Sequence, residues 1–108
     1  MEINMPLTRV FKDTVKARAA HDGAFRAALL SEAVELLLSG DVATGRLVLR
    51  DFINATTEFE DLASGIGKPA KSVMRMFGPN GNPTAQNLFS VISHLQKVTG
   101  IHLGIKAA

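Results

Sequence analysis

The stretch that most constrains the fold lies in the second half of the chain, at residues 57–78. Its apolar residues recur at three- and four-residue steps on both sides of Gly65 and Gly67, as one buried helical face requires. Glycine interrupts a helix and allows the positive φ angle of a tight turn. The stretch therefore predicts two short helices joined by a glycine turn and packed against each other, the arrangement of a helix-turn-helix.

The ends and faces of these two helices are also predicted. Thr57 and Glu60 fit a capping box, in which the threonine oxygen accepts from a first-turn N–H and the glutamate reaches back. Pro69 suits the first turn of the second helix, where its missing N–H has no partner to lose. On that helix we expect an inward face of Val73, Met76 and Phe77, and an outward face or edge of Ala70, Lys71, Ser72, Met74 and Arg75.

Helical periodicity accounts for most of the remaining chain. Three helices are expected before the focal stretch, over residues 8–20, 23–39 and 41–55, with N-caps at Thr8, Asp22 and Asp41 and a stop at Gly40. Residues 78–83 are all Gly, Pro or Asn and predict a loop, after which Thr84 caps a last helix that Gly100 ends.

Residues 101–106 alternate apolar and other residues, which predicts a short strand. One strand has no partner in an otherwise helical chain, so pairing with a second copy, and hence a homodimer, is expected. A length of 108 residues suits a single domain, residues 1–108. Within it we expect N-terminal helices in 1–56, the helix-turn-helix and closing helix in 57–100, and the dimerising strand in 101–106.

The net charge of +2 conceals a segregation along the chain. Residues 1–61 contain all ten acidic residues against seven Lys and Arg, a balance of −3, and residues 62–108 contain five Lys and Arg alone. A segment of one charge sign favours a polyanionic partner, although chance segregation in a small protein remains an alternative. The basic pair Arg46 and Arg50 shares its helix with Asp51, which favours a solvated face over phosphate contact.

Nothing in the sequence indicates catalysis or a bound cofactor. The chain lacks cysteine, and His21, His94 and His102 are dispersed, so neither a disulfide nor a metal site is expected. The serines lack a nucleophile-elbow context, and the glycines at 65 and 67 follow a helix rather than a nucleotide-binding strand. The longest apolar runs are far below the roughly 20 residues of a membrane span, and we expect a cytoplasmic protein without a small-molecule substrate.

Several phrases of the sequence resemble one family of bacterial regulators. The phrases are residues 24–41, 50–56, 59–67, 68–78, 72–83 and 94–100, and the resemblance extends over nearly all of the chain. They resemble the phage-repressor-like helix-turn-helix superfamily and, within it, the addiction-module antidote proteins, which are antitoxins encoded beside toxins of the Hig and Rel type. The resemblance implies an all-α fold, a five-helix phage-repressor-like domain with an N-terminal helical extension, to which the predicted C-terminal strand is added.

The same resemblance implies a function. The chain would be a dimeric antitoxin that represses its own type II toxin-antitoxin operon and neutralises a ribonuclease-type toxin by binding it. Its partners would be double-stranded operator DNA and the cognate toxin. The expected DNA-contacting residues are Lys68, Ala70, Lys71, Ser72, Arg75, Asn80 and Asn82. Ala70 would contact a thymine methyl group, and the backbone N–H groups of residues 80–82 would approach phosphate.

Other interpretations remain open at this point. Lys71 and Arg75 could be a solvated helix face, and Asn80 and Asn82 could be turn residues only. The chain could be a stand-alone transcriptional repressor without a toxin partner. Toxin neutralisation could instead be its main activity, with acidic residues of the N-terminal helices, Glu32, Glu35 and Asp41, facing a basic toxin surface.

Overall fold

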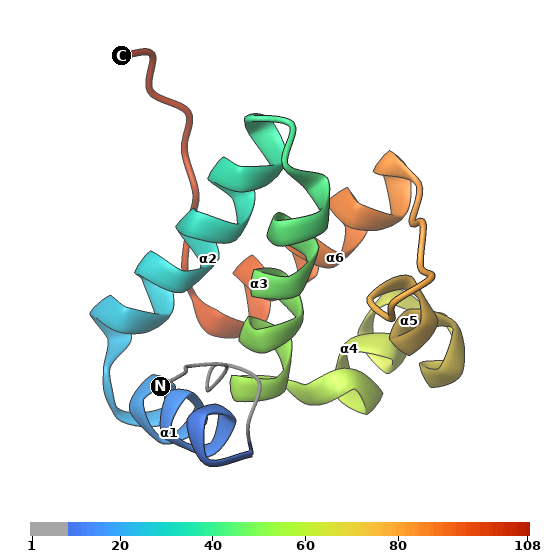
Figure 1. The fold of residues 1–108 in the computed structure, drawn as a ribbon, viewed down its shortest axis with the longest axis horizontal. Helices are drawn as coiled ribbons and strands as arrows, with labels where there is room; N and C mark the ends of the chain where they lie inside the picture. The colour runs from blue at the N-terminus through green and yellow to red at the C-terminus, as the bar shows by residue number, and fades with distance from the viewer. Residues whose placement is uncertain (1–8) are drawn as a thin grey trace, which may run out of the picture. The chain divides into compact units, whose positions relative to one another are not determined.

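The computed structural model describes residues 9–108, with side chains from residue 13 onward, and it is all-helical over that range (Figure 1). The predicted cap Thr8 lies outside the described residues. The chain divides into two compact units, residues 1–56 and 57–108. Their boundary coincides with the point at which the sequence separates the N-terminal helices from the focal stretch.

The first unit contains α1 (Arg9–His21), α2 (Gly23–Leu38) and α3 (Val42–Ala55). Helices α2 and α3 pack side by side as a hairpin, and α1 packs against both (Figure 1). The fully buried core of this unit consists of Ala19, Leu30, Ala33, Leu49, Phe52 and Ile53. Gly45 permits a close approach of α2 and α3, because a Cβ there would lie 2.9 Å from the Leu37 side chain.

Two aspartates cap helices in the first unit, as the sequence predicts. Asp22 accepts a hydrogen bond from the Phe25 N–H at 3.0 Å, and Asp41 accepts from the Thr44 N–H at 3.2 Å. The Phe25 N–H, together with the Arg18 side chain at 3.5 Å, holds the pKa of the Asp22 carboxyl below its ordinary value. Between α2 and α3, Gly40 has the expected positive φ, +96°.

The second unit contains α4 (Glu58–Ile66), α5 (Ala70–Met76) and α6 (Ala85–Thr99). Helix α4 packs against both α5 and α6. Its buried core is drawn from all three helices and consists of Phe59, Leu62, Ala63, Val73, Phe77, Val91, Ile92 and Leu95. The predicted end signals of α6 are confirmed: the Thr84 hydroxyl accepts from the Asn87 N–H at 3.1 Å, and Gly100 has a φ of +76°.

The predicted capping box at the start of α4 is wrong. Thr57 has helical backbone angles and makes no side-chain capping hydrogen bond. A capping hydroxyl needs an extended backbone at its own residue to point back over the first turn. The chain instead enters α4 through a positive φ of +64° at Glu58, a conformation uncommon for a residue with a side chain. The local pattern of threonine and glutamate did not carry that information.

The predicted strand at residues 101–106 does not form within the described chain, which contains no strand. The Ile101 N–H donates to the Thr99 hydroxyl at 3.3 Å, and the Leu103 N–H donates to the Gln96 side-chain oxygen at 2.8 Å. Ile101 and Leu103 are half-buried. Two backbone N–H groups of the tail are thus bound by side chains of α6, whereas Ile105, the third apolar residue of the alternating pattern, is 86% exposed.

Candidate nucleic-acid interface

The turn between α4 and α5 is made by Gly67. Its φ is +70°, and the Lys68 N–H donates to the Ala63 carbonyl at 3.0 Å, which closes the end of α4. The other candidate, Gly65, lies inside α4, where a Cβ would overlap the His94 ring of α6. The two glycines thus have different functions, one in the turn and one in helix packing.

Helix α5 begins one residue later than predicted. Pro69 is its N-cap, with φ −64° and ψ 141°, and Ala70 is the first helical residue. The Pro69 carbonyl accepts from the N–H groups of Ser72 and Val73 at 3.0 and 3.2 Å. Proline at this position supplies the first acceptor of the helix but no side-chain cap, so α5 depends on tertiary packing for its stability.

One face of α5 is anchored in the core of the second unit. Val73 is fully buried, Phe77 is 2% exposed, and Met76 is half-buried, which confirms the predicted inward face. The Phe77 ring packs against the Phe59 ring of α4, with centroids 5.9 Å apart and the planes tilted by 56°. This aromatic contact fixes the end of α5 on α4.

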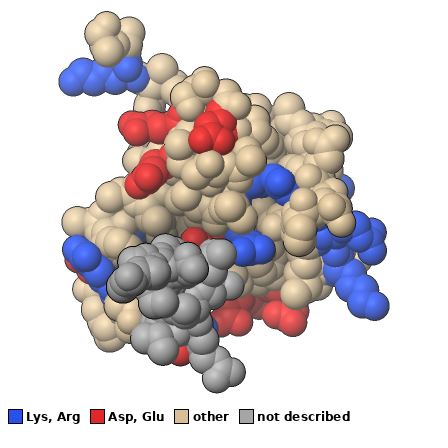
Figure 2. All heavy atoms as spheres, viewed as in Figure 1, with Lys and Arg blue, Asp and Glu red and all other residues tan. Residues whose placement is uncertain are grey.

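The opposite face of α5 is open to solvent. Lys71, Met74 and Arg75 are exposed, and Ala70 and Ser72 are half-buried at its two edges. At 100° per residue the three exposed side chains occupy about 100° of arc on one side of the helix. Lys and Arg side chains gather over α5 in the space-filling view (Figure 2). The predicted outward orientation of Lys71 and Arg75 is confirmed, and Lys68, in the turn, is half-buried.

The loop after α5 folds tightly against the end of the helix. The Gly78 N–H donates to the Arg75 carbonyl at 3.1 Å, and the Gly81 N–H donates to the Gly78 carbonyl at 3.0 Å. A Cβ on Gly81 would approach the Met76 and Arg75 carbonyl oxygens to 2.3 and 2.4 Å. The expectation that the Gly81 N–H would face phosphate is therefore wrong, because that group closes the loop. The Asn80 and Asn82 residues on either side are exposed.

The structural boundary changes the interpretation of the charge pattern. Residues 1–56 contain seven Lys and Arg and seven Asp and Glu, whereas residues 57–108 contain five and three, a balance of +2. The segregation therefore occurs inside the second unit. Its three carboxylates, Glu58, Glu60 and Asp61, are exposed at the start of α4, where the helix dipole favours them. Figure 2 shows this acidic group at the lower edge, apart from the basic group over α5.

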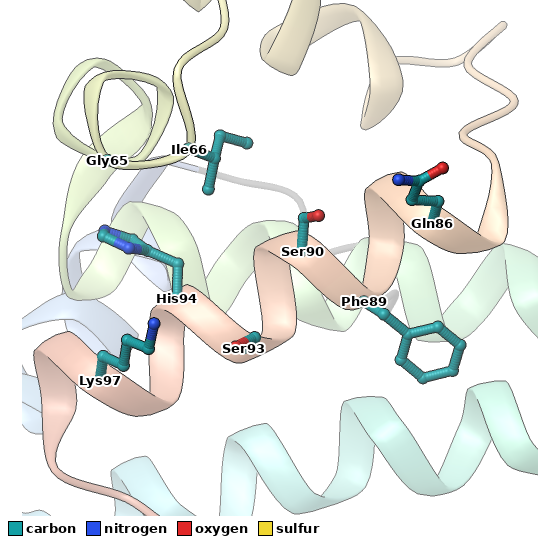
Figure 3. A pocket seen from close by; sticks show the side chains of 8 residues that line it. All are labelled: Gly65, Ile66, Gln86, Phe89, Ser90, Ser93, His94 and Lys97. Carbon is teal, nitrogen blue, oxygen red and sulfur yellow. The ribbon is translucent and has the colours of Figure 1, made fainter.

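A shallow hollow between α4 and α6 was not predicted from the sequence. It has a volume of about 460 Å³, and the His94 ring points from α6 toward Gly65 at one end (Figure 3). Lys97 is the one charged side chain among its lining residues. They are Gly65, Ile66, Gln86, Phe89, Ser90, Ser93, His94 and Lys97. The one sequence feature that could have indicated this close packing of α4 on α6 is Gly65, a second glycine just before the Gly67 turn.

Comparison of the chain with models of known protein families, with curated proteins and with solved structures gave no match. The function is therefore inferred from the molecule itself. Among the described residues there is no cluster of three or more His, Asp or Glu side chains that could hold a metal ion. No described helix has both the length and the apolar character needed to cross a membrane.

Proposed function

We propose that this chain binds double-stranded DNA, with α4 and α5 as a phage-repressor-like helix-turn-helix and α5 in the major groove. One observation carries the proposal: α5 is anchored by the buried residues Val73 and Phe77 and presents Lys71 and Arg75 to solvent. No carboxylate follows Asp61 in the sequence, so no acidic side chain of α5, its loop or α6 opposes an approaching phosphate backbone.

The residues of this surface suit different kinds of contact. Arg75 and Lys71, on the outward face, have the donors that pair with the N7 and O6 acceptors of guanine. Ser72 is half-buried at the edge of α5, and Lys68, in the turn, lies just before the helix. The exposed Asn80 and Asn82 side chains lie in the loop that follows the C-terminal end of α5. These peripheral groups suit phosphate or sugar, whose contacts position a protein without reading sequence.

The experiment that tests this proposal uses a duplex enriched by the parent protein from a random-sequence library. Replacing both Lys71 and Arg75 by Ala should weaken binding to it at least about 30-fold, since two base or phosphate contacts are lost. The salt dependence of log K should become shallower by about one for each phosphate contact removed. Fluorescence anisotropy over a range of salt concentrations measures both quantities.

A matched control removes the same charge elsewhere in the second unit. Lys97 and Lys106 are also exposed, and replacing both by Ala lowers the net charge equally. This variant should retain affinity within a few-fold, because only long-range attraction changes. Equal losses in both double variants would mean that α5 is not the reading surface. Failure of the parent to enrich any duplex would contradict DNA binding itself.

Within this proposal the chain acts in the cytoplasm as the antitoxin and autorepressor of a toxin-antitoxin operon, on the strength of the sequence resemblance. A dimer would place two copies of α5 in successive major grooves about 34–36 Å apart. For toxin binding, α2 offers the exposed residues Glu32 and Glu35 and, near its end, Leu38, which is 66% exposed. An acidic surface with an exposed apolar side chain suits a basic protein partner.

Co-expression with the product of the adjacent reading frame tests the antitoxin assignment. The two proteins should co-purify, and the chain should relieve growth inhibition by that product. Replacing Glu32 and Glu35 by Gln should weaken the complex and change duplex binding by no more than a few-fold, since neither residue belongs to the second unit and only long-range attraction changes. If the adjacent product is not toxic and does not bind, the chain is a stand-alone repressor.

A further inference from the structure

Met74 is a large apolar side chain on the solvent-facing side of α5. It is 52% exposed, whereas Val73 and Phe77 of the same segment are 0% and 2% exposed. At 100° per residue Met74 projects about 60° from Lys71, and Arg75 lies about 40° beyond Lys71. One apolar side chain thus adjoins two cationic ones on a single exposed stripe, and packing within the second unit does not account for its position.

We propose that Met74 is a specificity-determining residue that contacts the 5-methyl group of thymine in the major groove. This inference rests on the proposed DNA binding through α5. Thymine is the one DNA base with an apolar group on its major-groove edge, so an apolar side chain on a reading helix discriminates in its favour. Methionine is unbranched and polarisable, which lets it adapt to a methyl group whose position varies with local groove geometry.

The structure assigns this contact to Met74 in place of Ala70, the residue that the sequence suggested for it. Ala70 is half-buried at one edge of the exposed stripe, and its side chain is a single methyl group. Met74 lies one helical turn further along, is exposed, and extends three bonds beyond its Cβ. Lys71 and Arg75 beside it supply the attraction that brings the stripe to DNA.

The test compares two versions of the parent-enriched duplex that differ in one chemical group. Replacing thymine by uracil at each position in turn removes the methyl group and leaves base pairing unchanged. At one thymine in each half-site the parent should bind the uracil version about fourfold more weakly, as expected when roughly 0.8 kcal/mol of apolar burial is lost. Met74→Ala should bind both versions equally, and Met74→Leu should retain the preference.

Val98→Ala is the matched control, because Val98 is 50% exposed on α6, outside α5. It should discriminate thymine from uracil as the parent does. An enriched sequence without a methyl-sensitive thymine, or a Met74→Ala variant with an unchanged preference, would overturn the inference while leaving DNA binding in place. No enriched duplex at all would overturn both proposals.

Discussion

Helices α3 and α5 each carry two basic residues four positions apart, but they present them differently. Arg46 and Arg50 are half-buried on α3, which also includes Asp51. Lys71 and Arg75 are exposed on α5, which has no carboxylate. The sequence spacing is the same in both helices. The feature that makes α5 the candidate DNA-contacting helix, and α3 not, is therefore the exposure of its two basic side chains and the absence of a carboxylate near them in the helix.

The largest effect should come from removing the anchor that presents the α5 pair. Phe77→Ala should lower the free energy of unfolding by about 3–5 kcal/mol, because it leaves a cavity beside Phe59. Urea denaturation followed by circular dichroism measures this loss. Duplex affinity should fall as well, although Lys71 and Arg75 are still present.

Phe89→Ala is the control for that variant, since the Phe89 side chain is 63% exposed in the same unit. Its unfolding free energy should stay within about 0.5 kcal/mol of the parent value. If Phe77→Ala and Phe89→Ala lowered the free energy of unfolding equally, the burial of Phe77 would not be what holds α5 in place. The proposed difference between α5 and α3 would then lose its structural basis.

A smaller effect should come from the loop that closes on the end of α5. Gly81→Ala should cost about 1–3 kcal/mol, because its Cβ would meet two carbonyl oxygens of the backbone, which cannot move aside independently. Thermal unfolding measures the change. Gly104→Ala is the matched glycine control, because no atom lies within 4 Å of the place that a Cβ at residue 104 would occupy. An unchanged melting temperature for Gly81→Ala would show that the loop does not hold α5.

The unit that contains α3 should respond to acid through Asp22. Its carboxyl pKa is lowered by the Phe25 N–H and by Arg18. The ionised carboxylate therefore stabilises the fold at pH values above 3.8, the ordinary pKa of an aspartate. That stabilisation is lost as the pH falls through the lowered pKa of the folded state. Asp22→Asn should flatten the acid limb of a stability-against-pH curve, measured by urea denaturation. An identical acid limb in parent and variant would exclude Asp22 as a contributor.

The smallest effect is expected for the basic pair on α3. Replacing Arg46 and Arg50 by Ala should change duplex affinity by no more than about twofold, the range typical of residues away from an interface. Anisotropy on the same enriched duplex sharpens the contrast with the α5 double variant. A loss as large as that from α5 would place α3 at the interface.

Features encoded by neighbouring residues could be predicted from the sequence. The caps at Asp22, Asp41 and Thr84 each depend on an acceptor three residues before a free N–H, and all three are present. The inward face of α5 follows from the spacing of Val73 and Phe77, both of which are buried. The exposure of Lys71 and Arg75 follows from the same periodicity.

Features that depend on the path of the backbone, or on contacts outside the local pattern, could not be predicted in this way. The cap at Thr57 fails because the backbone of Glu58 takes a positive φ. No strand is seen at residues 101–106 of the described chain, where the Leu103 N–H donates to the Gln96 side chain. The different structural functions of Gly65 and Gly67 can be distinguished only in the structure, where the His94 ring packs against Gly65. The closure of the 78–83 loop by the Gly81 N–H likewise required its three-dimensional path.

The acidic start of α4 has a consequence for the kinetics of an encounter with a polyanion. Glu58, Glu60 and Asp61 are exposed in the same unit as the basic α5 and give that unit an electric dipole. In the electric field of a polyanion, a molecule with such a dipole turns its basic side toward the polyanion before contact. The dipole therefore acts on the association rate more than on the lifetime of the complex. In the proposed DNA complex, the three carboxylates would thus help to orient the unit without touching DNA.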